Sequence, residues 1–371
     1  MSLRGAAAII GIGELKPERR KPGRTGPGLA MEAARLCIQD AGLRREDVDG
    51  LITEIPFANA CEFAEILGIQ PTWSHGVNMM GSSGPTTIAL AAMAVNAGLA
   101  NNVLCLVTSG EEGGFGGGGG SQPLGGQFAQ WAGPFGPGPG ANFWYALVAN
   151  RYQHEFGLTD EERVSIAVQQ RENAQHNPEA AFYGTPATTE DILNSRMVAN
   201  PLTLLECVMP TMGAAALMVS RPEAAKYAPH PPVYLLGAGH STDRGVPGIT
   251  YVDRMTKSPV EVSARNAYKM AGVGPQDMDI ASLYDCYTIT VIIEFEDAGF
   301  APKGEGGKYI AENDVTFKSD KVAINTHGGQ LSFGQPGTAG GMSHVTEAVR
   351  QLMGRGEARQ KEKVDYCFVN G

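Results

Sequence analysis

Apolar residues in this chain recur at helical spacing and then in short runs. In residues 33–42 (AARLCIQDAG) the apolar side chains share one face of a helix that ends at Ala41-Gly42. Glycine is common just beyond a helix, because it adopts the left-handed backbone conformation without strain. A short turn then leads into the apolar run Leu51-Ile52. The pattern therefore predicts a helix followed by a strand.

The same pattern returns at an offset of 230 residues. Residues 263–272 again predict a helix that ends at Ala-Gly, and Ile280–Leu283 predicts the strand after it. Six identities at one offset, with turns at the same places, favour an internal duplication over chance. The identical pairs are Ala34/Ala264, Arg35/Arg265, Ala41/Ala271, Gly42/Gly272, Asp47/Asp277 and Asp49/Asp279.

Each copy is followed by a strand, a glycine-rich turn and a second helix. In the first copy the turn is Asn78–Gly84 and the helix is Thr86–Ala97. In the second, the apolar run Lys321–Ile324 leads into the glycine-rich loop Asn325–Gly341 and a helical pattern at His344–Leu352. Loops of this kind bring backbone amides close to a ligand. We expect the two equivalent loops to face one another.

The length of 371 residues exceeds one ordinary core, so two to three layers or domains are expected. The duplication predicts an α/β protein of two pseudo-symmetric halves. We place the N-terminal half at residues 1–110 and 200–245, and the C-terminal half at residues 246–371. Residues 111–199 are then an insertion.

The insertion begins with the glycine tract Gly113–Gly120. This tract fits a flexible linker and fits equally a lid or substrate-tunnel loop. Helices are predicted at 143–156 and 160–177, the second with Thr159 as N-cap, and a third helix opens near Thr189.

The charge balance argues against a nucleic-acid partner, since the formal net charge is −10 at pH 7. The basic cluster Lys16–Arg24 fits a solvated loop, or a contact with the phosphate end of coenzyme A. The histidines lack metal-ligand spacing, so no metal site is expected.

The N-terminus lacks the apolar core of a signal peptide. The longest apolar segment, Ile88–Ala100, is interrupted by Asn96 and is shorter than the ~20 residues of a membrane span. Dispersed cysteines without CxxC pairs indicate reduced thiols, and together these features predict a cytoplasmic protein. The cysteines are Cys37, Cys61, Cys105, Cys207, Cys286 and Cys367.

Short motifs spread in order along the chain resemble the thiolase superfamily, and within it the sterol-carrier-protein-type branch of thiolase-like lipid-transfer proteins. The resemblance implies a duplicated, five-layered α-β-α-β-α fold, usually a homodimer, with an acyl-CoA site between the halves. It implies a coenzyme A thioester as substrate, no tightly bound cofactor, and for some members a small partner with a zinc ribbon and an OB-fold. Relatives continue beyond the counterpart of Gly371 into another glycine-rich loop. The motifs are Ala8–Glu14, Asp40–Leu43, Asn173–Pro178, Asn200–Leu202, Gly213–Ala216, Tyr284–Tyr287 and Gly328–Gly341.

The sequence departs from the thiolase pattern at both catalytic positions that the resemblance implies. Where thiolases carry a nucleophilic cysteine in Cys-x-Ser-Gly, this chain has Gly81-Ser82-Ser83-Gly84. Where they carry Gly-His-Pro, it has Gly334-Gln335-Pro336, and glutamine cannot act as a general base. Ordinary thiolysis needs a thiolate and a base, so it is disfavoured. Cys286 and Cys367 are alternative nucleophiles, or buried structural thiols.

Aldolase members of this branch also lack the thiolase cysteine and histidine, and tyrosines take over acid–base work in them. By this resemblance Tyr284 or His327 is the base of a retro-aldol cleavage, and Gln335 and loop amides are hydrogen-bond donors. The structural alternatives are that Tyr284 closes a strand and that His327 bonds only a loop carbonyl. The candidate catalytic residues are Tyr284, His327 and Gln335. The candidate substrate-binding residues are Asn78, Gly81, Ser82, Ser83, Tyr287, Gly328 and Gly329.

Three functions follow. The first is an enzyme that makes or breaks a carbon–carbon bond in an acyl-CoA without a cysteine acyl-enzyme. The second is a non-catalytic acyl-CoA-binding or lipid-transfer protein, or a scaffold subunit. The third is an acyltransferase with a displaced cysteine. A serine hydrolase is disfavoured because Gly81–Gly84 is not Gly-x-Ser-x-Gly, and NAD binding because Gly11-x-Gly13 lacks the third glycine.

Overall fold

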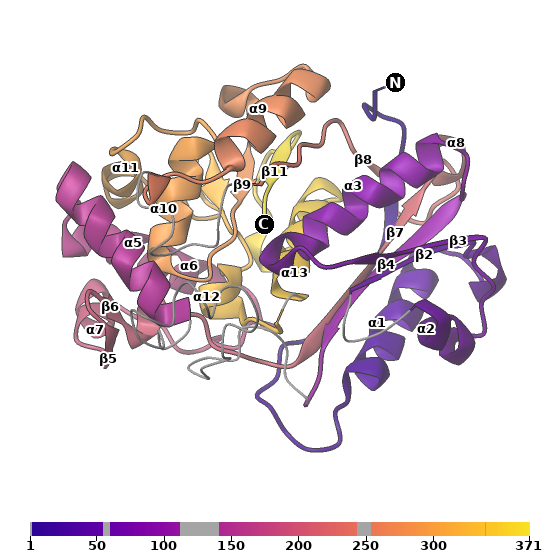
Figure 1. The fold of residues 1–371 in the computed structure, drawn as a ribbon, viewed down its shortest axis with the longest axis horizontal. Coiled ribbons are helices and arrows are strands. Elements are labelled where there is room, and N and C mark those ends of the chain that lie inside the picture. Colours follow the sequence, from indigo (N-terminus) through magenta and orange to yellow (C-terminus); the bar gives the residue numbers. More distant parts are fainter. Residues whose placement is uncertain (1, 55–59, 112–140, 243–253, 338) are drawn as a thin grey trace, which may run out of the picture.

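The computed structural model describes residues 2–54, 60–111, 141–242, 254–337 and 339–371 (Figure 1). The predicted glycine tract of the insertion lies outside the described residues. The helices are α1 Gly26–Asp40, α2 Ala60–Leu67, α3 Ser83–Asn96, α5 Ala141–Phe156, α6 Asp160–Gln175, α7 Thr189–Leu193, α8 Pro222–Ala225, α9 Val260–Ala271, α10 Thr288–Asp297, α11 Gly306–Glu312, α12 Gly329–Phe333 and α13 Ala339–Leu352. The strands are β1 Ala8–Glu14, β2 Gly50–Glu54, β3 Trp73–Val77, β4 Asn102–Ser109, β5 Met197–Ala199, β6 Leu202–Thr203, β7 Gly213–Ser220, β8 Val233–Tyr234, β9 Ile280–Ser282, β10 Ala323–Ile324 and β11 Cys367–Val369.

The first half is built on a mixed six-stranded sheet in the order β3-β2-β4-β7-β1-β8. β2 pairs in parallel with β3 and β4, whereas β7 is antiparallel to both of its neighbours, β4 and β1. The central strands are apolar on both faces, as expected for strands that are covered by helices on both sides.

The second half carries a parallel three-stranded sheet in the order β10-β9-β11. Its register repeats that of the first sheet: Gly50 lies opposite Val103 in the first, and Ile280 lies opposite Cys367 in the second. Gly50 and Ile280 are related by the offset of 230 residues. The strand pairing therefore supports the duplication inferred from the sequence.

The layers follow the order α-β-α-β-α (Figure 1). One apolar core joins α1 and α2 to one face of the six-stranded sheet, and a second core joins α3 and α13 to its other face. α13 also contacts β9 and β11, and a third core packs α9 and α10 on the far side of that sheet. The two central helices α3 and α13 lie side by side between the sheets.

The predicted helix ends are confirmed. Gly42 and Gly272 follow α1 and α9 with φ angles of 68° and 71°, in the left-handed region. The hydroxyl of Thr159 accepts a hydrogen bond from the Glu162 amide at 3.1 Å and caps α6. Helix α6 packs against α10, α11 and α12, so the predicted insertion lies on the second half. The domain boundaries themselves stay a prediction.

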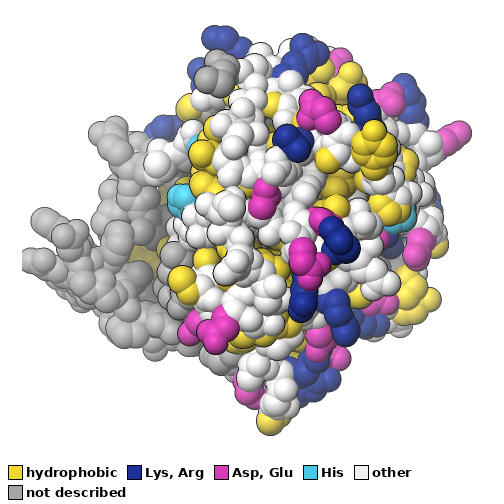
Figure 2. Space-filling view, turned by 90° about the vertical axis from the view of Figure 1, so that its right-hand side faces the viewer, with side chains coloured by type: hydrophobic (Ala, Val, Ile, Leu, Met, Phe, Trp, Pro, Cys, Tyr) yellow, Lys and Arg dark blue, Asp and Glu magenta, His cyan; other side chains and the backbone are white. Residues whose placement is uncertain are grey.

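Acidic and basic side chains are interspersed on the face shown in Figure 2. In the basic segment, Lys21 pairs with Glu18 at 2.9 Å and Arg24 pairs with Glu32 at 2.7 Å. Part of this charge is therefore neutralised within the chain. No helix among the described residues is long and apolar enough to cross a membrane.

Candidate active site

The two glycine-rich loops meet between the halves. A Cβ at Gly341 would lie 1.9 Å from the carbonyl oxygen of Gly81, and a Cβ at Gly84 would lie 2.5 Å from the Met342 nitrogen. Both contacts are shorter than side-chain carbons tolerate, so these glycines allow α13 to approach the start of α3. The expectation that the equivalent loops face one another is confirmed.

Tyr284 is placed beside this junction by the end of β9. The Leu283 amide donates to Asn325 Oδ1 at 2.7 Å, and the Tyr284 amide donates to Asn370 Oδ1 at 3.1 Å. Asn325 follows β10 and Asn370 follows β11, so the neighbouring strands on both sides fix the backbone that carries Tyr284.

The ring of Tyr284 fills the space beside Gly81. A Cβ at Gly81 would lie 2.3 Å from Cζ and 2.6 Å from the hydroxyl oxygen of Tyr284. The same hydroxyl accepts a hydrogen bond from Gln335 Nε2 at 3.1 Å. Burial of most of the side chain, and then the nearby Cys286, raise the pKa of Tyr284 well above its usual value. At neutral pH this side chain is therefore a phenol that can donate a proton.

Gln335 is held by a segment of the first half. Its amide donates to the Met209 carbonyl at 3.0 Å, and its carbonyl accepts from the Thr211 amide at 2.9 Å. The side chain is buried with 6% exposure. The structure thus brings Tyr284, Gln335 and Gly81 together.

Asp285, the residue after Tyr284, is a buried carboxylate that ties several elements together. Asp285 accepts hydrogen bonds from the amides of Gln330 and Leu331 at 2.8 and 3.0 Å. His344 Nε2 lies 3.0 Å from Asp285 Oδ1, and its other ring nitrogen lies 3.2 Å from Ser282 Oγ. These contacts tie α12 and α13 to β9. The motif Tyr284–Tyr287 was a signal for this region, but Asp285 itself was not singled out.

His327 lies below the junction and is 1% exposed. Its Nε2 is 3.4 Å from Ser343 Oγ, and its ring packs between His344 and Phe333. Burial first, and then the neighbouring His344, lower the pKa of His327 well below its usual value. The histidine is therefore neutral, and no contact joins it to Tyr284.

Gly328 and Gly329 make room for protein groups. A Cβ at Gly329 would lie 2.2 Å from Asp285 Oδ2, and a Cβ at Gly328 would lie 2.9 Å from the Ala174 side chain of α6. Both residues have positive φ angles, which glycine adopts without strain. Close packing of the loop on α6 and Asp285 explains these two glycines.

The polar residues of the first loop bond mainly to its own backbone. Ser83 Oγ accepts from the Met79 amide at 3.0 Å, and Ser82 Oγ donates to the Met79 carbonyl at 2.8 Å. Asn78 is exposed, and its Oδ1 lies 3.4 Å from the Met80 amide. These groups shape the turn that leads into α3.

Tyr287 and the two alternative cysteines are buried or half-buried. The Tyr287 hydroxyl donates to Asn142 Oδ1 at 2.6 Å, and its ring stacks on Tyr145. Burial raises the pKa of Cys286 to about 12 and that of Cys367 well above its usual value. Neither sulfur is a thiolate at neutral pH, so neither is poised as a nucleophile.

Comparison with known proteins places this geometry in a family. Residues 245–371 match the family model described as "Thiolase C-terminal domain-like". The chain is 36% identical over 363 residues to a steroid side-chain-cleaving aldolase of Thermomonospora curvata, covering 95% of this chain and 91% of that protein. It is 34% identical over 369 residues to the 17-hydroxy-3-oxo-4-pregnene-20-carboxyl-CoA lyase of Mycobacterium tuberculosis, covering 95% and 92%.

A solved structure, the Ltp2-ChsH2(DUF35) aldolase, superposes with a TM-score of 0.90 at 34% identity, covering 98% of this chain and 94% of that one. The chain belongs to the thiolase superfamily. Within it, the chain belongs to the thiolase-like branch that contains these aldolases. The predicted family and the predicted thiolase fold are confirmed. The relatives' names agree with the first of the three predicted functions, an enzyme that makes or breaks a carbon–carbon bond in an acyl-CoA.

Proposed function

We propose that this protein is a lyase that cleaves a carbon–carbon bond of a β-hydroxyacyl-CoA by a retro-aldol reaction. The observation that carries the proposal is the contact between Tyr284 and Gly81. The resemblance assigns the thiolase nucleophile to Gly81, and there a phenol hydroxyl fills the space in which a nucleophilic side chain would stand.

The reaction needs only proton movement around one bond. The β-hydroxyl loses its proton, the bond between the α and β carbons breaks, and the β carbon becomes a carbonyl. The electron pair passes to the thioester as an enolate, which takes up a proton at the α carbon. Atoms balance because the proton lost from the hydroxyl equals the proton gained by the carbon.

Tyr284 is the proton donor to the α carbon in this proposal. Its raised pKa keeps the proton on the oxygen until the enolate forms. The β-hydroxyl proton passes to solvent water as the bond breaks, and the phenolate recovers a proton from solvent after it has protonated the α carbon. Gln335 Nε2 positions the tyrosine oxygen. His327, buried and without a contact to Tyr284, supports the loop rather than the reacting atoms.

The substrate class follows from the relatives. Two of them are named for the cleavage of a steroid side chain or of a pregnene carboxyl-CoA, so we assign a steroid-CoA ester with a β-hydroxyl group to this chain. These names favour a lyase over the acyltransferase that was the third function predicted from the sequence. The solved relative is named with a DUF35 protein, and we propose a partner subunit of that kind. A zinc ribbon and OB-fold in the partner, a homodimer and a cytoplasmic location stay predictions.

Product analysis tests the function. The protein, alone and with a DUF35-type partner, is incubated with a steroid β-hydroxyacyl-CoA without added coenzyme A. A lyase releases a steroid ketone and a shorter acyl-CoA in equal amounts. A thiolase requires free coenzyme A, and a lipid-binding protein leaves the ester intact. Either of those outcomes contradicts the proposal.

A further inference from the structure

His344 of α13 is a buried histidine that contacts the chain on both sides of Tyr284. Its Nδ1 lies 3.2 Å from Ser282 Oγ, and its Nε2 lies 3.0 Å from Asp285 Oδ1. Ser282 ends β9 and Asp285 directly follows Tyr284, so the imidazole spans the turn that carries the phenol. The three polar side chains are 0% exposed. A substrate therefore cannot contact them directly.

The duplication shows which position of the first half corresponds to this histidine. Helices α3 and α13 match at an offset of 256 residues. Gly98 and Gly354 follow them with φ angles of 72° and 69°. Within them, the hydroxyls of Thr87 and Ser343 each donate to the carbonyl of a glycine three residues earlier, at 2.7 and 2.6 Å. The two helices are therefore equivalent residue by residue.

At these two places the first half is apolar. The counterpart of His344 is Ile88 (344 − 256), and the counterpart of Ser282 is Ile52 at the offset of 230 (282 − 230). Both isoleucines are buried in one apolar core, in which α3 packs on β2 as α13 packs on β9. Two apolar side chains therefore satisfy the fold here. Burial of polar groups in their place costs free energy unless they are hydrogen-bonded, which points to a role beyond packing.

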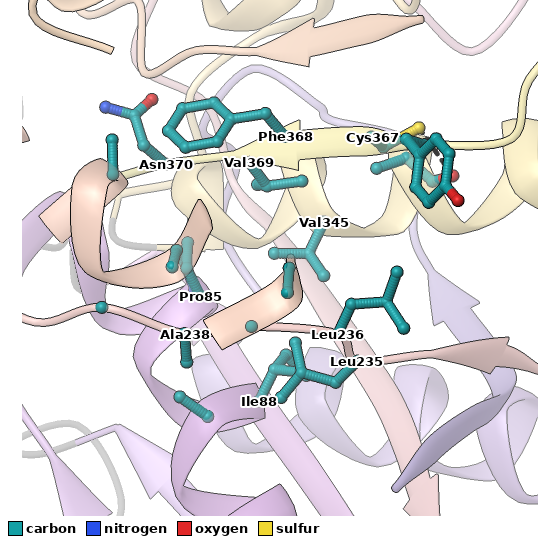
Figure 3. Close-up of a pocket in the computed structure, with 18 of the residues that line it drawn as sticks. Pro85, Ile88, Leu235, Leu236, Ala238, Val345, Cys367, Phe368, Val369 and Asn370 are labelled. Carbon is teal, nitrogen blue, oxygen red and sulfur yellow. Dashed lines mark hydrogen bonds between the residues drawn. The ribbon is translucent and has the colours of Figure 1, made fainter. Parts of the chain in front are cut away.

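Helix α13 contacts both partners of the pair formed by Tyr284 and Gly81. At its start, a Cβ at Gly341 would lie 1.9 Å from the Gly81 carbonyl oxygen. About one turn later, His344 is turned toward β9 and bonds the residues around Tyr284. Figure 3 shows Val345, the next residue of α13, among apolar side chains that line a pocket beside β11. One helix thus holds the loop of Gly81 and the end of β9 in register.

We propose that His344 is a positioning residue for Tyr284. By bonding Ser282 and Asp285 it fastens the end of β9 to α13, and so it sets where the phenol stands relative to residue 81. Without the imidazole the phenol stays in the site but leaves the geometry in which it donates a proton. The effect on catalysis rests on the proposed lyase function, whereas the effect on the position of Tyr284 does not.

His344→Ile installs the residue of the first half and tests the effect on catalysis. With a steroid β-hydroxyacyl-CoA as substrate, kcat should fall about 20- to 100-fold with KM unchanged, as for a displaced catalytic group. His344→Gln keeps an N–H donor near the place of Nε2, and its kcat should stay within about fivefold of the unmodified protein. Val349→Ala is the control for lost stability, since this buried side chain of α13 belongs to the apolar core of the first sheet. It should leave kcat unchanged.

A spectroscopic measurement tests the position of the phenol without substrate. Fluorotyrosine is incorporated at position 284, and its fluorine NMR resonance is recorded in each variant. The resonance should shift in His344→Ile, return toward its original place in His344→Gln, and stay there in Val349→Ala. Ser282→Ala removes the other contact of the imidazole and serves if His344→Ile does not fold. It should shift the resonance and lower kcat about fivefold.

Equal losses of kcat in His344→Ile and Val349→Ala would show a merely structural role and overturn the proposal. A kcat of His344→Gln as low as that of His344→Ile would also overturn it. So would an unchanged fluorine resonance in His344→Ile, or in Ser282→Ala where that variant is used. If the unmodified protein cleaves no ester, the lyase function is wrong, while the fluorine resonance still decides whether His344 positions Tyr284.

Discussion

The hydroxyl oxygen of Tyr284 lies 2.6 Å from the point where a Cβ of residue 81 would stand. The Tyr284 ring can therefore occupy its present place only while residue 81 is glycine, because any side chain at position 81 would overlap the ring. A thiolase-type cysteine at position 81 is incompatible with Tyr284 where it lies.

This relationship predicts a strong coupling between the two positions. Gly81→Ala should lower the free energy of unfolding by about 1–3 kcal/mol, as overpacking does. In a Tyr284→Ala background the same change should cost little, because the ring is gone. Chemical denaturation of the four proteins gives the coupling energy. Additive effects of the two substitutions would contradict the contact.

Gln335→Ala removes the donor to the Tyr284 hydroxyl. A hydrogen bond of this kind contributes about 1 kcal/mol, so kcat should fall about five- to tenfold with little change in KM. Thr185→Ala is a control remote from this contact, since the Thr185 amide bonds the Phe182 carbonyl and survives the change. An equal loss of activity in both variants, or none in Gln335→Ala, would refute the positioning role.

The pH dependence of turnover separates a tyrosine donor from a tyrosine base. Because the pKa of Tyr284 is raised well above its usual value, the phenol keeps its proton through pH 10. The rate should therefore show no titration of a tyrosine near pH 10, the usual value. A rate that rises with pH through this range would indicate a phenolate base and would refute the donor role.

His327 predicts a pH dependence of stability. Its folded pKa is below the usual 6.5, so below that pH the unfolded chain binds a proton that the folded chain does not. Its contribution to stability is complete above pH 6.5 and is lost as the pH falls below it. His327→Gln should reduce the slope of the unfolding free energy just below pH 6 by up to about 1.4 kcal/mol per pH unit. An unchanged slope would show that His327 is not a buried neutral group.

The elements that local pattern determines were predictable from the sequence. The helix ends at Gly42 and Gly272 and the cap at Thr159 depend on residues within one turn, and the structure has them as predicted. The duplication and the meeting of the two loops also followed from the sequence, because they depend on repeated spacing.

Contacts between distant segments could not be predicted in the same way. Asp285 and His344 are 59 residues apart (344 − 285) and meet only through packing of α13 on β9. From the sequence, Gly328 and Gly329 were predicted to bind the substrate. In the structure, the absence of a side chain at these two positions makes room for α6 and for the carboxylate of Asp285.

The most direct test of the central claim is single-turnover cleavage of a steroid β-hydroxyacyl-CoA by Tyr284→Phe. Binding of the ester is measured in parallel by calorimetry, and Tyr183→Phe, an exposed tyrosine, is the matched control. We predict that the bond-cleavage rate falls about 10²–10⁴-fold in Tyr284→Phe, as for loss of an acid–base group, while ester binding and the rate of the control are unchanged. Cleavage by Tyr284→Phe at the rate of the unmodified protein would contradict it.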